Sequence, residues 1–143
     1  MSLEPNVVPT IRMGPCLLVP IQIDLDDRTV ELLQQQLLAA VERERVRAIV
    51  LDVSMVDIID SYISYTLSET AGMARLMGCR TILCGVRPQV ALTLAQMGVR
   101  LRDVEVARDL EHALLLARAA ERKETVGVDR RGALGGRSAG GKL

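Results

Sequence analysis

The residues of this chain that could take part in chemistry lie close together in one segment, Leu51 to Ile63. This segment contains three aspartates and one serine next to the last of them: Asp52, Asp57, Asp60 and Ser61. Carboxylates at this spacing could bind a hard metal ion or act as an acid/base pair. They could equally cap a helix, because an acidic loop is ordinary where a strand leads into a helix. Composition alone favours capping over a metal site or an acid/base pair.

Ser61 has two interpretations, and both depend on its place at the expected start of a helix. As an N-cap, its hydroxyl would accept a backbone N–H and stabilise the helix by about 1 kcal/mol. As a phosphorylation site, it would gain about −1.5 to −2 charges. Helix N–H groups could receive the phosphate, whereas Asp57 and Asp60 would repel it. Such a modification changes the charge of a binding surface with little change of fold, but spacing alone favours the cap.

Other classes of chemistry find little support in the sequence. The single histidine, His112, lies far along the chain from any plausible nucleophile, which argues against His-based catalysis. The cysteines Cys16, Cys79 and Cys84 form no CxxC pair, so we expect buried small side chains rather than a disulfide or metal ligands. The chain has no Trp, no Phe and a formal net charge of +0. This composition disfavours base stacking and electrostatic attraction to nucleic acid or anionic membrane.

Strand and helix patterns alternate along the chain and set the position of Ser61. Short apolar runs predict strands, and apolar residues at helical spacing predict helices. The expected strands cover residues 7–11, 16–23, 48–53, 81–84 and 104–106, and the expected helices cover 27–44, 61–77, 88–97 and a last stretch from 110. This alternation predicts an α/β fold with a mixed or parallel β-sheet and about four α-helices.

The length of 143 residues suits one folded domain, which we expect over residues 1–121. Residues 122–143 are rich in Gly and Arg and contain few apolar residues, so we predict a disordered C-terminal tail. No apolar run has the length of a signal peptide or of a membrane span of roughly 20 residues. The sequence therefore predicts a cytoplasmic protein.

The segment around Ser61 resembles the STAS domain, the family of anti-sigma-factor antagonists, and the resemblance covers about residues 8–121. Residues 50–56 with Ile59, Asp60 and Ser61 are similar to the family's strand, loop and Asp-Ser phosphorylation site. Further similar segments are 74–78, 84–88 and 94–99. The Gly-Val-Arg-Pro motif at 85–88 and the segment 21–27 look especially like the small serine-type scaffold proteins of the stressosome, the RsbS group.

This resemblance implies a non-enzymatic scaffold that needs no cofactor and no metal. Proteins of this kind co-assemble with RsbR-type STAS proteins into a large oligomer and sequester a serine/threonine kinase of the RsbT type. The kinase phosphorylates the matching residue, here Ser61, and is released, and a phosphatase acting on Ser61 resets the site. The resemblance places Asp57, Asp60, Ser61 and Tyr62 on the partner-binding surface.

Two other functions stay open at this point. The chain could be a simple anti-sigma-factor antagonist that binds one anti-sigma kinase in a small complex. It could also be a small-ligand-binding STAS module that uses the acidic loop and the helix N-termini. The size of the complex with partners separates the first alternative from the scaffold, and calorimetry with nucleotides tests the second.

Overall fold

A five-stranded mixed β-sheet forms the centre of the molecule. The computed structural model describes residues 8–96 and 101–119. The strands lie side by side in chain order: β1 (Ile11–Met13), β2 (Cys16–Pro20), β3 (Ala48–Asp52), β4 (Arg80–Cys84) and β5 (Val104–Ala107). β1 is antiparallel to β2, and the remaining neighbours are parallel. The predicted α/β class with a mixed sheet is confirmed.

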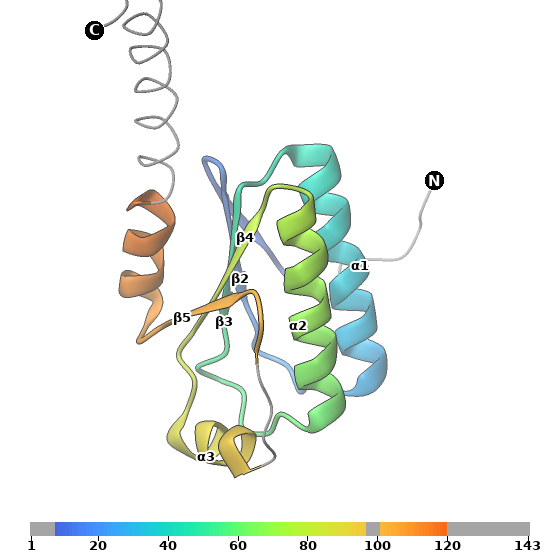
Figure 1. Ribbon diagram of the computed structural model, residues 1–143, viewed down its shortest axis with the longest axis vertical. Helices are drawn as coiled ribbons and strands as arrows, with labels where there is room; N and C mark the ends of the chain where they lie inside the picture. The colour runs from blue at the N-terminus through green and yellow to red at the C-terminus, as the bar shows by residue number, and fades with distance from the viewer. Residues whose placement is uncertain (1–7, 97–100, 120–143) are drawn as a thin grey trace, which may run out of the picture.

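Helices cover both faces of this sheet (Figure 1). The helices α1 (Asp27–Glu44) and α2 (Ser61–Leu76) lie on one face, and the helical residues 110–119 lie on the other. The short helix α3 (Pro88–Gln96) lies at one end of the sheet. About four helices were expected, and this prediction is confirmed. In the part of the chain that the structure describes, no helix is long and apolar enough to cross a membrane. The expected tail, 122–143, lies outside the described residues.

The central strand β3 is buried on both of its faces. Ile49 and Leu51 belong to the larger apolar cluster, which also contains the inward side chains of α1 and α2. Ala48 and Val50 point to the other face and belong to a smaller cluster with Ala113 of the segment 110–119. Because neither face meets water from Ala48 to Leu51, the strand needs apolar residues at these positions. This explains the continuous apolar run that precedes Asp52, the half-buried last residue of β3.

Helix α1 begins and ends at the predicted residues, but the first two strands differ from the prediction. β1 covers 11–13 rather than 7–11, because Gly14 and Pro15 form the turn that pairs Met13 with Cys16. Gly14 has a φ of +61°, a conformation that glycine adopts without strain. β2 ends at Pro20 and does not continue to residue 23. Proline lacks the N–H that a central strand needs, and the chain then turns toward the start of α1.

The connections that follow β2, β3 and β4 meet at the same edge of the sheet, because these strands are parallel. The N–H of Val53, directly after β3, donates to the carbonyl oxygen of Cys84 at the end of β4 (3.0 Å). The next residue on that side, Gly85, has a φ of +77°. A Cβ atom at Gly85 would lie 2.9 Å from the Cβ of Ser54, closer than two carbon atoms can approach. Gly85 therefore permits the close contact between the two connections.

We expect Gly85→Ala to lower the free energy of unfolding by about 1–3 kcal/mol, because it adds both backbone strain and a steric clash. Urea unfolding followed by circular dichroism measures this loss. Gly72→Ala is the matched control, since its Cβ would meet its nearest atom, Asp103 Oδ2, at an ordinary 3.4 Å. Equal stability of the Gly85→Ala protein and the parent would contradict this role of Gly85.

Candidate functional site

The connection between β3 and α2, residues 53–60, is fixed to the core at several points. The side chains of Val53, Val56 and Ile59 are buried, with exposed fractions of 1–3%. Between them, Met55 and Ile58 are 62% and 77% exposed. The connection therefore has a fixed backbone and an outward apolar surface. Large exposed apolar side chains next to polar groups are typical of sites where proteins bind each other.

Asp60, rather than Ser61, caps helix α2. The Oδ1 atom of Asp60 accepts a hydrogen bond from the N–H of Ile63 (2.8 Å), and the Asp60 carbonyl oxygen accepts one from the N–H of Ser64 (3.0 Å). The N-cap interpretation of Ser61 is therefore wrong, and Ser61 is the first residue within the helix. Asp and Ser are both good N-caps, so two adjacent candidates could not be separated by residue type.

The Ser61 hydroxyl is open to solvent. Its side chain is exposed and makes no hydrogen bond with any residue that the structure describes. Ser64, one turn further along α2, is only 1% exposed and donates its hydroxyl to the Asp60 carbonyl oxygen (2.9 Å). Ser68 is half-buried and donates to the carbonyl oxygen of Arg102 (3.2 Å). Of the Ser and Thr residues on α2, Ser61 alone therefore presents an exposed, unbonded hydroxyl.

Arg87 links the two connections at this edge of the sheet. Its guanidinium forms an ion pair with the carboxylate of Asp57, and its Nε atom donates to the carbonyl oxygen of Ser54 (2.8 Å). The side chains of Arg87 and Asp57 are 39% and 65% exposed, so solvent screens the pair and it contributes about 1 kcal/mol or less. Its consequence is electrostatic, because a fixed cation balances the charge of Asp57. The Gly-Val-Arg-Pro motif contains Arg87, but sequence reasoning did not predict this contact.

The three aspartates of the segment do not form a metal site. Asp52 accepts a hydrogen bond from the N–H of Ser54 (3.0 Å), Asp57 pairs with Arg87, and Asp60 caps α2. Within residues 8–96 and 101–119, no three carboxylate, imidazole or thiol side chains are placed to hold a metal ion. Each of the three carboxylates thus makes a local contact, and of the three only Asp60 caps a helix.

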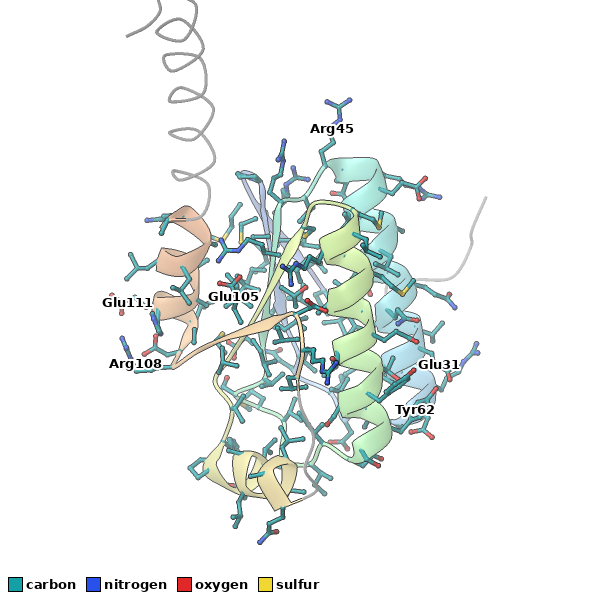
Figure 2. All side chains as sticks on the ribbon, viewed as in Figure 1. Glu31, Arg45, Tyr62, Glu105, Arg108 and Glu111 are labelled. Carbon is teal, nitrogen blue, oxygen red and sulfur yellow. The ribbon has the colours of Figure 1, made fainter. Side chains whose placement is uncertain are left out.

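Tyr62 is held in place by a residue of the neighbouring helix. Its hydroxyl donates a hydrogen bond to the carboxylate of Glu31 on α1, and Figure 2 shows the two side chains together where α1 and α2 begin. This hydrogen bond to the carboxylate raises the pKa of the Tyr62 hydroxyl above its ordinary value. The residue is 40% exposed, so Tyr62 can still contact a partner beside Ser61. Glu31 carries no sequence signal that distinguishes it from other exposed helix residues.

The remaining candidates lie apart from this site. His112 lies on the helical segment over the opposite face of the sheet, where its Nδ1 atom accepts the N–H of Arg108 (3.1 Å). Cys16, Cys79 and Cys84 are buried, as predicted. Burial raises the pKa of the Cys79 thiol to about 12 and that of Cys84 to about 11. Thiols with such high pKa values are poor nucleophiles and poor metal ligands at neutral pH.

Comparison with known proteins gives a family match over most of the chain. A family model of the STAS domain matches residues 7–113. RsbT co-antagonist protein RsbRB of Bacillus subtilis (strain 168) is 27% identical over 97 residues, which cover 68% of this chain and 35% of the relative. RsbT co-antagonist protein RsbRA of the same organism is 23% identical over 99 residues, covering 69% of this chain and 36% of the relative. The chain spans about a third of the length of these relatives.

Solved structures show the same fold. A serine-to-glutamate variant of RsbS from Moorella thermoacetica superposes with a TM-score of 0.70 at 29% identity, covering 80% of this chain and 97% of that one. A chain from a structure of the stressosome, described as a signal integration and transduction hub, superposes with a TM-score of 0.63 at 24% identity. It covers 80% of this chain and 99% of that one, and at this identity it supports the fold alone.

The assignment of the α2 cap can be tested by stability. Asp60→Ala should lower the free energy of unfolding by about 1 kcal/mol, because the N–H of Ile63 loses its acceptor. Ser61→Ala, the adjacent control, should leave this free energy unchanged, since its hydroxyl bonds no described residue. Thermal or urea unfolding of both variants measures the difference. If Ser61→Ala lowered the free energy of unfolding and Asp60→Ala did not, Ser61 rather than Asp60 would be the N-cap.

Proposed function

This chain belongs to the STAS domain family, and from that premise we propose that it is a non-enzymatic scaffold of a stressosome-type complex. In this role it sequesters a serine/threonine kinase of the RsbT type and releases it when Ser61 is phosphorylated. Its relatives support the choice within the family: two curated relatives are named RsbT co-antagonists, and a similar solved structure is an RsbS. The exposed, unbonded hydroxyl of Ser61 on a rigid helix start is the observation that carries the proposal.

A kinase substrate needs a hydroxyl that the enzyme can reach and a backbone that holds it in position. Asp60 fixes the first turn of α2 through its cap, and Ile59 anchors the preceding residue in the core. Ser64 lacks the necessary exposure, because its hydroxyl is buried and bonded within the helix. The structure thus favours modification at Ser61 over modification at its neighbour on α2.

The charges around Ser61 favour a switch at the surface over a change of fold. Asp57 is paired with Arg87, and Asp60 is engaged by the N–H of Ile63, so neither carboxylate is free of a compensating contact. The first N–H groups of a helix have no acceptor within the helix and can face a phosphate. A phosphate of about −1.5 to −2 charges can therefore remain at this position and change the surface that a partner meets.

We assign the partner-binding surface to Asp57, Asp60, Ser61 and Tyr62, together with the exposed apolar side chains beside them. Met55 and Ile58 supply apolar area, and Tyr62 is held by Glu31 at the edge of the surface. A partner that buries this surface must bring the Ser61 hydroxyl into its contact area. A new dianion at Ser61 would lose its hydrating water in such a contact, and this cost of desolvation weakens the complex.

Phosphorylation can be tested with the kinase whose gene lies nearest to that of this chain. Incubation with ATP should add one phosphate to the parent and none to Ser61→Ala, as measured by intact mass. Ser54→Ala is the control, because Ser54 is also exposed but belongs to the preceding connection. It should be phosphorylated like the parent. Equal phosphorylation of the Ser61→Ala protein would exclude Ser61 as the site.

Release and assembly form a second prediction. Phosphorylation of the parent should weaken kinase binding by about tenfold or more, whereas Ser61→Ala should retain the kinase in the presence of ATP.

With an RsbR-type STAS protein added, the complex of this chain with the kinase should elute as a large hetero-oligomer in size-exclusion chromatography with light scattering. A complex of one chain with one kinase, unchanged by that addition, would support a simple anti-sigma-factor antagonist instead. A phosphatase should restore kinase binding.

A further inference from the structure

A cavity of about 180 Å³ lies at the edge of the sheet opposite to Ser61. It is lined by the first residues of three parallel strands, Cys16 of β2, Ala48 of β3 and Arg80 of β4. The segment 110–119 bounds it on the outer side with Leu114 and Ala117. Ser61, in contrast, follows the carboxyl end of β3. Nothing in the proposed role of Ser61 uses this cavity.

The backbone around the cavity is held by hydrogen bonds between segments far apart in the chain. The N–H of Arg47 donates to the carbonyl oxygen of Pro15 in the β1–β2 turn (2.7 Å). The N–H of Arg80 donates in turn to the carbonyl oxygen of Arg47 (2.9 Å). These bonds join the turn, the start of β3 and the start of β4. The cavity is therefore preformed, which lowers the cost of filling it.

The walls of the cavity are largely apolar. Met13, Cys16, Ala48, Leu114 and Ala117 contribute to its lining. An apolar cavity of about 150 Å³ is large enough to hold benzene, so this one can hold a small ring or a short alkyl chain. Burial of such a group would remove apolar surface from water on both the ligand and the protein.

The charged groups of the lining all have the same sign. Arg47, Arg80 and Arg118 line the cavity, and none of the described lining residues is acidic. Arg80 forms an ion pair with Glu105 of β5, whose Oε2 atom accepts from its Nε atom (2.7 Å), so the charge of Arg80 is already balanced. Figure 2 shows Glu105 between the sheet and the helical segment. Arg118 forms no hydrogen bond or ion pair with a described residue. A guanidinium at the edge of an apolar cavity is suited to a carboxylate or a phosphate.

We propose that this cavity binds a small anionic amphiphile, a molecule with a short apolar body and one carboxylate or phosphate group. The body fills the space between the strand ends and Leu114, and the anionic group pairs with Arg118. The chain's own residues 122–143 contain more basic than acidic residues, so they complement the arginines poorly. Because the cavity and Ser61 lie at opposite edges of the sheet, a bound ligand leaves the phosphorylation site open.

The test uses the full chain and three probes that share a six-carbon chain: hexanoate, hexanol and hexylammonium. Titration through the millimolar range is followed by backbone amide chemical shifts. Hexanoate should shift the amides of Ala48, Leu114 and Ala117, and should bind about tenfold more tightly than hexanol. Hexylammonium should bind most weakly. Hexyl phosphate, titrated in parallel, shows whether the site prefers a phosphate or a carboxylate.

Two variants and one control separate the contribution of the Arg118 charge to binding from that of the apolar cavity. Arg118→Gln should remove the preference for hexanoate over hexanol, and Ala117→Leu should fill the cavity and weaken both probes. Arg45→Gln is the matched control, because Figure 2 shows Arg45 extending into solvent from the end of α1. Amide spectra with the parent's dispersion show that each variant is folded. Equal affinity for hexanoate and hexanol, unchanged binding in Ala117→Leu, or no shift at the cavity would overturn the proposal.

Discussion

Burial of β3 on both faces is the constraint on which the rest of the structure depends. Because Ile49 and Leu51 face α1 and α2 while Ala48 and Val50 face the segment 110–119, β3 must lie between two helical layers. Its neighbours β2 and β4 run parallel to it, so the connections after all three strands come to one edge. Ser61 and Arg87 lie on two of those connections or directly after them. The candidate site thus follows from the direction of the strands.

The sequence predicted those features that depend on local patterns. The apolar spacing from Val30 to Val41 gave the correct bounds of α1, and the run before Asp52 gave β3. The predicted and observed elements differ where neighbouring residues are equally suited to begin a strand or cap a helix. The first strand was expected at residues 7–11, but the turn at Gly14 pairs residues 11–13 with β2 instead. Asp60 and Ser61 are both good caps, and only backbone geometry places the cap at Asp60.

Contacts between distant residues could not be predicted in this way. The pair of Arg87 with Asp57 joins residues separated by 30 positions, and the bond between Tyr62 and Glu31 joins residues separated by 31. Such pairs depend on how the helices and connections pack, and each residue alone looks like an ordinary exposed charge. The pair of Arg87 with Asp57 nevertheless affects the electrostatics near Ser61, because it balances the charge of one of the three aspartates.

The burial of the thiols also determines how this protein can be observed. Cys79 is 1% exposed and Cys84 is 0% exposed, and burial raises the pKa of both thiols far above neutral pH. A reagent that attacks thiolates can therefore modify these residues only when β4 and its surroundings unfold locally. The rate at which Cys84 is alkylated then reports the opening of the sheet itself. A cysteine introduced at an exposed position would react well before these two, so their presence would not interfere with a fluorescent label at that position.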